Sequence, residues 1–133
     1  MSEEHPHLAL VRRMWDAGAR GDADVICDLF APDAVLRSHG APGPLVGEFK
    51  GIAEILDFLA RAGELVDDSR AEIIDIYTSD AGAVIRYRTV ATRGASHLDM
   101  QFLYVLSIAQ GRIIDATIVP TDQRRNDEFW RSH

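Results

Sequence analysis

The sequence predicts an α+β fold in which helices precede and cover a mainly antiparallel sheet. Between residues 83 and 120 three apolar stretches follow one another with only short breaks: residues 83–93, 96–108 and 112–120. Glycines at these breaks suit tight reversals, because glycine readily adopts the positive φ that such turns need. Consecutive strands joined by short turns pair antiparallel. Upstream of residue 70 the apolar spacing is mostly helical instead, so helices and sheet are segregated along the chain.

Three helices are expected before these strands. The apolar residues of the segment 7–20 recur at helical spacing, and Gly21 follows as a stop signal. Asp22 is a suitable N-cap for a short second helix over residues 23–30. A third amphipathic helix is expected over residues 51–60.

Shorter elements lie around these helices. A strand is expected over residues 34–38, then a loop rich in glycine and proline at residues 39–47, and another strand over residues 71–78. After the last strand the tail carries Phe129 and Trp130. Two aromatic residues so near a terminus indicate that the tail docks onto the body of the domain.

Composition narrows the class of protein. A chain of 133 residues suits a single domain, 1–133, and its net charge of −7 argues against nucleic acid or an anionic membrane as partner. Cys27 is the single cysteine, so an internal disulfide or a cysteine-based zinc site is excluded. The five histidines lack metal-ligand spacing, and no apolar run reaches transmembrane length. A cytoplasmic protein without metal or other cofactor is expected.

Short motifs that lie in order along nearly the whole chain resemble those of a known family. They are LFAPDAV at 29–35, GPLVG at 43–47, FKG at 49–51, GRIID at 111–115, DQ at 122–123 and FW at 129–130. With this order the chain resembles the SnoaL-like branch of the nuclear transport factor 2-like superfamily. The resemblance implies a cone-shaped α+β barrel, in which three N-terminal helices pack in the concave face of a strongly bent sheet and leave a blind pocket. Members include polyketide cyclases, isomerases, hydrolases, ligand binders and dimerisation modules, so the fold narrows the function little.

Two specific chemistries of the superfamily are not expected. Ketosteroid isomerases use a carboxylate base, a tyrosine and a protonated aspartate. The matching positions hold Ser38, Met14 and Leu103. Limonene-type epoxide hydrolases hold a water between two carboxylates, whose places fall at or near Arg88 and Ile118. Neither set of groups can be assembled from these residues.

The aldol cyclases of the SnoaL-like branch make looser demands. They use an aspartate or histidine as acid and base over a hydrophobic substrate, and His39, Asp99 and Asp115 are the candidates here. Thr117 stands where members of this branch often have a tryptophan. The smaller threonine widens the pocket or removes an aromatic wall on which a ligand would stack. Cofactor-independent proton transfer at carbon, as in cyclisation, isomerisation or dehydration, is the reaction class that stays open.

Two arginines within a strand have two interpretations. Arg86 and Arg88 share one face of their strand, and Asp99 and Gln101 share one face of the next, because side chains alternate with period two. The resemblance implies that the matching positions line the pocket. The alternative is a solvent-facing or dimer surface with salt bridges. An Arg88–Asp99 pair would lower the pKa of Asp99 and make it a poor base.

The predicted catalytic residues are His39, Asp99 and Arg88. His39 ends the predicted strand 34–38 at the pocket rim, and histidine is the side chain best suited to acid–base chemistry near neutral pH. Asp99 is the second acid–base candidate, and Arg88 would stabilise an enolate. The predicted ligand-binding residues are Trp15, Leu36, Phe58, Val84, Arg86, Gln101, Leu103, Ala116 and Ile118.

The predicted function is binding of a small hydrophobic molecule with an acidic or carbonyl end, which Arg86 or Arg88 would hold, with or without catalysis. The alternative is a non-enzymatic ligand-binding or dimerisation module with a structural Arg/Asp network. A homodimer through the outer face of the sheet is expected. The apolar residues expected to be exposed there are Met100, Phe102, Tyr104 and Leu106.

Overall fold

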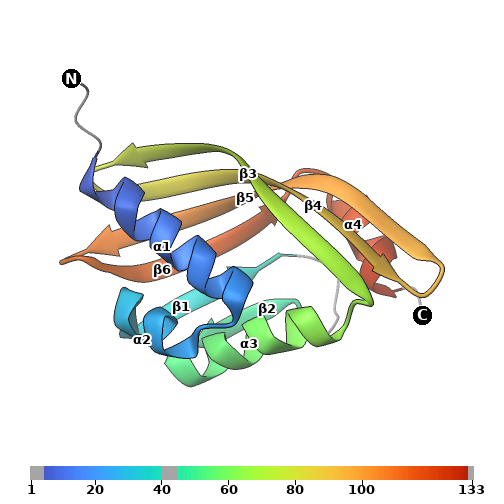
Figure 1. Ribbon diagram of the computed structural model, residues 1–133, viewed down its shortest axis with the longest axis horizontal. Helices are drawn as coiled ribbons and strands as arrows, with labels where there is room; N and C mark the ends of the chain where they lie inside the picture. The colour runs from blue at the N-terminus through green and yellow to red at the C-terminus, as the bar shows by residue number, and fades with distance from the viewer. Residues whose placement is uncertain (1–4, 40–44, 132–133) are drawn as a thin grey trace.

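The computed structural model describes residues 5–39 and 45–131 and confirms the α+β class (Figure 1). Within these residues, four helices accompany one six-stranded sheet with the order β2-β1-β6-β5-β4-β3. The elements in chain order are α1 (Pro6–Arg20), α2 (Ala23–Leu29), β1 (Phe30–Ser38), β2 (Gly47–Lys50), α3 (Ile52–Glu64), β3 (Asp68–Ser79), β4 (Gly82–Arg93), β5 (Ser96–Ala109), β6 (Arg112–Pro120) and α4 (Gln123–Arg131).

The sheet is mixed and strongly bent. The pairs β1–β2, β3–β4, β4–β5 and β5–β6 are antiparallel, as expected for consecutive strands, and β1 pairs with β6 in parallel. The register shifts in β1, in β3 and at the β5–β6 pairing. Such irregularities bend and twist strands. The sheet therefore curves around the helices and stays open at its edges, β2 and β3.

The first three helices cover the concave face of the sheet (Figure 1). Gly21 ends α1 in the left-handed region, at φ 67°, and the Asp22 carboxylate caps α2 by accepting a hydrogen bond from the Val25 N–H at 3.3 Å. Buried side chains of α1, α2 and α3 form the main core with the inner face of the sheet. None of the helices in the described ranges combines the length and apolarity needed to cross a membrane.

Two elements were not expected as such. The aromatic tail docks as predicted, but it does so as a helix, α4, which Asp122 caps by accepting from the Arg125 N–H at 3.1 Å. Phe129 anchors this helix and is only 4% exposed. The loop expected at residues 39–47 is followed by the short strand β2, which pairs with β1. Four mostly exposed residues show no clear alternation, so this strand left no signal in the pattern.

The predicted orientation of β4 and β5 is wrong. Met100, Phe102, Tyr104 and Leu106 were expected to be exposed at a dimer interface, but all four are at most 8% exposed and face the helices. On β4 the buried side is the odd-numbered one, so Arg86 and Arg88 face outward. The positions matched to the isomerases favoured the opposite choice. The alternation in β5 predicts the observed orientation, because a large apolar side chain stands at every second position. The face that carries these apolar side chains is the one that must be removed from water.

Candidate functional site

A cavity of about 420 Å³ lies between the helices and the inner face of the sheet. Its apolar lining includes Leu45, Val46, Phe58, Leu59, Val66, Leu98, Phe102 and Ile118. Its polar lining includes Ser38, His39, Ser69, Tyr87, Thr89, Asn126, Asp127 and Arg131. A volume of this size, a mostly apolar wall and a few polar groups are typical of a small-molecule site.

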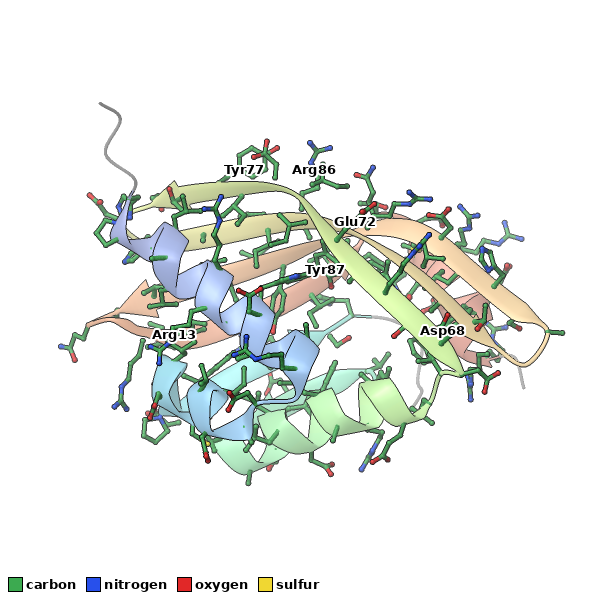
Figure 2. All side chains as sticks on the ribbon, in the orientation of Figure 1. Arg13, Asp68, Glu72, Tyr77, Arg86 and Tyr87 are labelled. Atoms are coloured by element: carbon green, nitrogen blue, oxygen red, sulfur yellow. The ribbon has the colours of Figure 1, made fainter. Side chains whose placement is uncertain are left out.

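Tyr87 of β4 is held between two aromatic rings. The Trp15 ring of α1 meets it edge-on at 5.0 Å between centroids, and the Phe102 ring of β5 stacks on it at 5.5 Å with an interplanar angle of 15°. Figure 2 shows Tyr87 on the helix side of the sheet, whereas its neighbour Arg86 projects from the opposite side near Tyr77. Packing on both sides leaves the Tyr87 ring little rotational freedom.

The hydroxyl of Tyr87 has no hydrogen-bond partner within residues 5–39 and 45–131, although the side chain is half-buried and lines the cavity. Burial raises the pKa of this hydroxyl, with a smaller contribution from Tyr104. The phenol therefore stays neutral at physiological pH and can donate its proton in a hydrogen bond. A hydroxyl in a cavity wall that no described residue engages is a natural contact point for an oxygen atom of a ligand.

Ser38 and His39 line the cavity from β1. The His39 N–H donates to the Ile118 carbonyl at 3.4 Å, and the His39 carbonyl accepts from Gln123 Nε2 at 3.2 Å, so its backbone is held by β6 and by α4. Tyr87 is on β4, which is separated from β1 by β6 and β5. In a flat sheet the two strands β1 and β4 would be about 14 Å apart, at ~4.8 Å between neighbouring strands. Bending shortens this path, so His39 and Tyr87 face the cavity from different walls.

The helix α4 supplies a third wall, with Asn126, Asp127, Trp130 and Arg131. Trp130 Nε1 donates to Asn126 Oδ1 at 3.1 Å. From β4, Arg93 donates to the Trp130 carbonyl, and its guanidinium lies 5.8 Å from the centroid of the Trp130 ring. These contacts, together with buried Phe129, fasten α4 to the sheet. Arg131 has no ion pair among the described residues and is exposed at this wall.

Arg88 and Asp99 lie on the outer face of the sheet and do not contact the cavity. Arg88 Nε and Nη2 donate to the two oxygens of Asp99 at 2.7 and 2.6 Å, and Glu72 lies 3.6 Å from the same guanidinium. The hydrogen bonds from Arg88 hold the pKa of Asp99 below its ordinary value, so it stays an anion. The predicted enolate stabiliser and the second acid–base candidate thus form a cross-strand ion pair away from the cavity.

The other predicted lining residues divide into three groups. Phe58 and Ile118 line the cavity. Leu36 and Ala116 are fully buried in the core, and Trp15 contacts the cavity indirectly, through Tyr87. Val84, Arg86, Gln101 and Leu103 share the outer face with Arg88 and Asp99, because the alternation of β4 and β5 is the reverse of the expected one.

Sequence reasoning missed the residues that the structure brings to the cavity in their place. Placing Arg86 and Arg88 toward the pocket puts Tyr87, which lies between them, on the opposite face, and the sequence analysis assigns no role to Asn126. The signals were present: Tyr87 alternates with Arg86 and Arg88, and Asn126 stands one helical turn before Trp130, behind the N-cap Asp122. Within the described ranges, no three histidine, cysteine, aspartate or glutamate side chains gather closely enough to hold a metal ion.

Comparison with known proteins identifies the family. Residues 11–116 match the family model of the SnoaL-like domain. The chain belongs to the SnoaL-like family. A relative, the uncharacterised protein Rv0034 of Mycobacterium tuberculosis, is 31% identical over 127 residues, which cover 92% of this chain and 95% of the relative.

Solved structures agree with the observed fold. Bal32a, from a soil-derived mobile gene cassette, superposes with a TM-score of 0.87 at 29% identity, over 94% of this chain and 96% of that one. An NTF2-like protein of unknown function from Burkholderia pseudomallei superposes with a TM-score of 0.86 at 17% identity, over 97% and 100% of the two chains. This SnoaL-like chain therefore has the nuclear transport factor 2-like α+β cone.

Replacing Asp99 by asparagine should lower stability at neutral pH, because Arg88 keeps its charge and loses a bidentate partner. The native pKa of Asp99 lies below its unfolded value of about 3.9. The stabilisation is therefore present above that value and is lost as the pH falls through the lower native pKa. Urea-unfolding midpoints of the wild type and Asp99→Asn should differ at neutral pH and converge in acid.

The control for this experiment is Asp28→Asn, which removes an exposed carboxylate of α2 that has no described ion pair. Its unfolding midpoint should follow that of the wild type at every pH. A gap between the wild type and Asp99→Asn that persisted in acid would contradict the assigned role of the pair.

Proposed function

We propose that this SnoaL-like protein binds a hydrophobic, ring-bearing small molecule through a carbonyl oxygen, and that it catalyses proton transfer at the carbon next to that carbonyl. The observation that carries the proposal is the hydroxyl of Tyr87, which has no partner among the described residues and belongs to a half-buried side chain in the wall of a mostly apolar cavity. The aromatic side chains Phe58, Phe102 and Trp130 in the lining favour a flat, apolar ligand body. Binding of small molecules is also the coarse function that the family supports.

The chemistry assigns one role to each of two residues. Tyr87 donates a hydrogen bond to the carbonyl oxygen, and this bond strengthens as negative charge develops on that oxygen. His39 accepts the proton from the neighbouring carbon, which leaves an enolate. The protonated imidazole then returns the proton to another carbon in an isomerisation. In an aldol cyclisation, the enolate carbon bonds to a second carbonyl carbon and the imidazolium protonates the resulting alkoxide.

In this scheme the neutral Tyr87, and not Arg88 as the sequence predicted, stabilises the enolate oxygen. A neutral donor in an apolar pocket holds a ketone without the desolvation cost of a buried guanidinium. It also leaves the enolate more basic than an arginine would, which suits a step in which the proton is returned to carbon. Asp99, paired with Arg88 outside the cavity, has no part in this scheme.

The alternative function is ligand binding without catalysis. It is favoured by the exposure of His39, whose imidazole has no hydrogen-bond partner within the described residues to orient it. A base that is not held by a second group contributes less to proton transfer than one that is. Both functions require the cavity and Tyr87, and they differ only in the role of His39.

Replacing Tyr87 by phenylalanine should weaken binding of a ketone and leave binding of its hydrocarbon analogue unchanged. A matched pair of probes is 2-acetylnaphthalene and 2-ethylnaphthalene, which differ in the carbonyl oxygen. The wild type should bind the ketone about tenfold more tightly, the value of one net hydrogen bond, and Tyr87→Phe should lose this preference. Equilibrium dialysis gives both dissociation constants.

The control for this experiment is Tyr104→Phe, because Tyr104 is a buried tyrosine of the neighbouring strand that does not line the cavity. It should keep the preference for the ketone. Equal affinity of the wild type for the two probes would sink the carbonyl-binding role of Tyr87. Failure of the wild type to bind either probe would count against a ligand site of this class.

Replacing His39 by alanine should abolish proton transfer and preserve binding. Exchange of the protons beside the carbonyl of 2-tetralone in D₂O, followed by NMR, measures this step without knowledge of the natural substrate. Loss of a general base should slow the catalysed exchange by about 100-fold or more. His97→Ala, at an exposed histidine of β5, is the control. A wild-type rate equal to that of buffer would favour binding without catalysis.

The outer face supports a homodimer as a second proposal. Val84, Leu103 and Val105 form an apolar centre on neighbouring strands, beside Tyr77, and Val105 and Tyr77 are 40% and 49% exposed. Arg86 lies among them, and its buried Nε lacks a hydrogen-bond partner. Tyrosine and arginine in an apolar patch are typical of interface hot spots. The Arg88–Asp99 pair contributes both signs of charge to this face, which suits contact with a second copy.

Replacing Val105 by glutamate should dissociate the dimer, because it buries a carboxylate against the partner's apolar centre. Sedimentation velocity over a range of concentrations should give a dimer for the wild type and a monomer for Val105→Glu. The matched control is Ala53→Glu, at an exposed position of α3 on the helical side of the sheet, which should remain dimeric. A wild-type protein that sediments as a monomer at every concentration would refute the homodimer.

A further inference from the structure

A second hydroxyl stands next to Tyr87 on the inner face of β4. Thr89 lies two residues further along the strand, so its side chain shares that face with Tyr87, and both residues line the cavity. The two strand positions are about 6.6 Å apart, at ~3.3 Å per residue. The Thr89 side chain is half-buried, and its hydroxyl has no hydrogen-bond partner within residues 5–39 and 45–131.

The oxygen of this hydroxyl is accessible from the cavity. Within the same ranges, Arg86 Nε is the side-chain nitrogen or oxygen that is both sealed from solvent and without a partner. The Thr89 oxygen also lacks a described partner, so it is not sealed, and a molecule in the cavity can reach it. Ser69 lines the cavity too, but its side chain is exposed and has water as a partner.

The neighbours of Thr89 in the sheet do not explain the hydroxyl. Thr89 pairs with Ala71 of β3 and with Met100 of β5. An alanine side chain cannot form a hydrogen bond, and a thioether sulfur is only a weak acceptor. Valine has nearly the same shape as threonine and favours strands equally well, so β4 would form without this oxygen.

The surroundings of Thr89 favour an uncharged group on the ligand. Its neighbours on the inner face of β3, β4 and β5 are Ala71, Tyr87, Ala91 and Met100, none of which carries a charge. A carboxylate or ammonium group placed among them would lose hydration without gaining a counter-charge. A hydroxyl or carbonyl oxygen needs only a hydrogen bond, and the Thr89 hydroxyl can both donate and accept one.

We propose that Thr89 is a specificity-determining residue that binds a second, uncharged oxygen of the ligand. This inference rests on the proposed function, because it takes Tyr87 as the site of the carbonyl. Both hydroxyls rise from one face of one strand, so the two ligand oxygens lie on the same edge of the molecule. Two hydrogen bonds of about 2.8 Å each bring these oxygens close together, which suits a hydroxyl on the carbon next to the carbonyl.

The test compares two ketones that differ only in a hydroxyl and a methyl group, 2-(hydroxyacetyl)naphthalene and 2-propionylnaphthalene. Equilibrium dialysis gives the ratio of their dissociation constants for each protein. Thr89→Val should shift this ratio about fivefold to tenfold against the hydroxyketone, because the bound hydroxyl loses its partner. The affinity for 2-propionylnaphthalene should stay within about twofold of the wild type, since the carbonyl contact with Tyr87 remains.

Two controls accompany this variant. Thr89→Ser keeps the hydroxyl, and Thr92→Val removes a hydroxyl from the same strand at a position that does not line the cavity. Both should keep the wild-type ratio. If the valine variant does not fold, Thr89→Ala removes the same hydroxyl without adding bulk, and the same shift is expected.

A ratio in the folded Thr89→Val or Thr89→Ala protein equal to that of the wild type would overturn the role of Thr89. Binding of 2-propionylnaphthalene would then still support the carbonyl site at Tyr87. If the wild type bound neither ketone, the proposed function would fail and this inference with it.

Discussion

The contact of Trp15 with Tyr87, and of Tyr87 with Phe102, is the interaction on which the site depends. It joins α1 to β4 and β5 at the inner face of the sheet, with centroid distances of 5.0 and 5.5 Å. Behind it lies the continuous core, in which Leu36, Ile85 and Ala116 are fully buried. In front of it the bent sheet and the helices no longer meet, and the cavity begins. A rigid aromatic boundary thus places a polar hydroxyl at the inner end of an apolar space.

The two faces of the sheet carry different kinds of polar group. On the inner face, the polar side chains that β3 and β4 contribute to the cavity wall are the uncharged Ser69, Tyr87 and Thr89, and the Tyr87 hydroxyl has no partner among the described residues. On the outer face, Arg88 and Arg37 are paired with carboxylates at 2.6 to 3.1 Å. Charged groups that stay in contact with water cost little, whereas the same groups inside the cavity would need compensation for lost hydration. The sheet accordingly offers the cavity uncharged hydrogen-bonding groups and keeps the Arg88–Asp99 and Arg37–Asp115 pairs on its outer face.

The helix α4 adds to the cone an element that family resemblance did not predict. It is attached by the buried ring of Phe129 and by the contacts of Arg93 with Trp130, and it closes one side of the cavity. Arg93 belongs to β4, the strand that also carries Tyr87, and Tyr87 packs against the same apolar cluster as Trp130. The cavity is therefore shaped jointly by the helix that begins the chain and by the one that follows the last strand.

The sequence by itself determined the α+β class, the order of the elements and most of their bounds, since glycines, caps and apolar periodicity act over a few neighbouring residues. It also pointed to His39, Phe58 and Ile118, which line the cavity. Only the tertiary structure decided which face of β4 and β5 is buried. That choice places Tyr87 in the cavity wall, where Arg86 and Arg88 were expected. A strand with bulky side chains on both faces can be buried on either, and the choice is made by the helices and neighbouring strands that cover one of them. The sequence of the tail likewise indicates that its aromatic residues dock onto the domain, but it does not predict that Asn126 lines the cavity. That part of the cavity wall exists only where α4 meets the sheet.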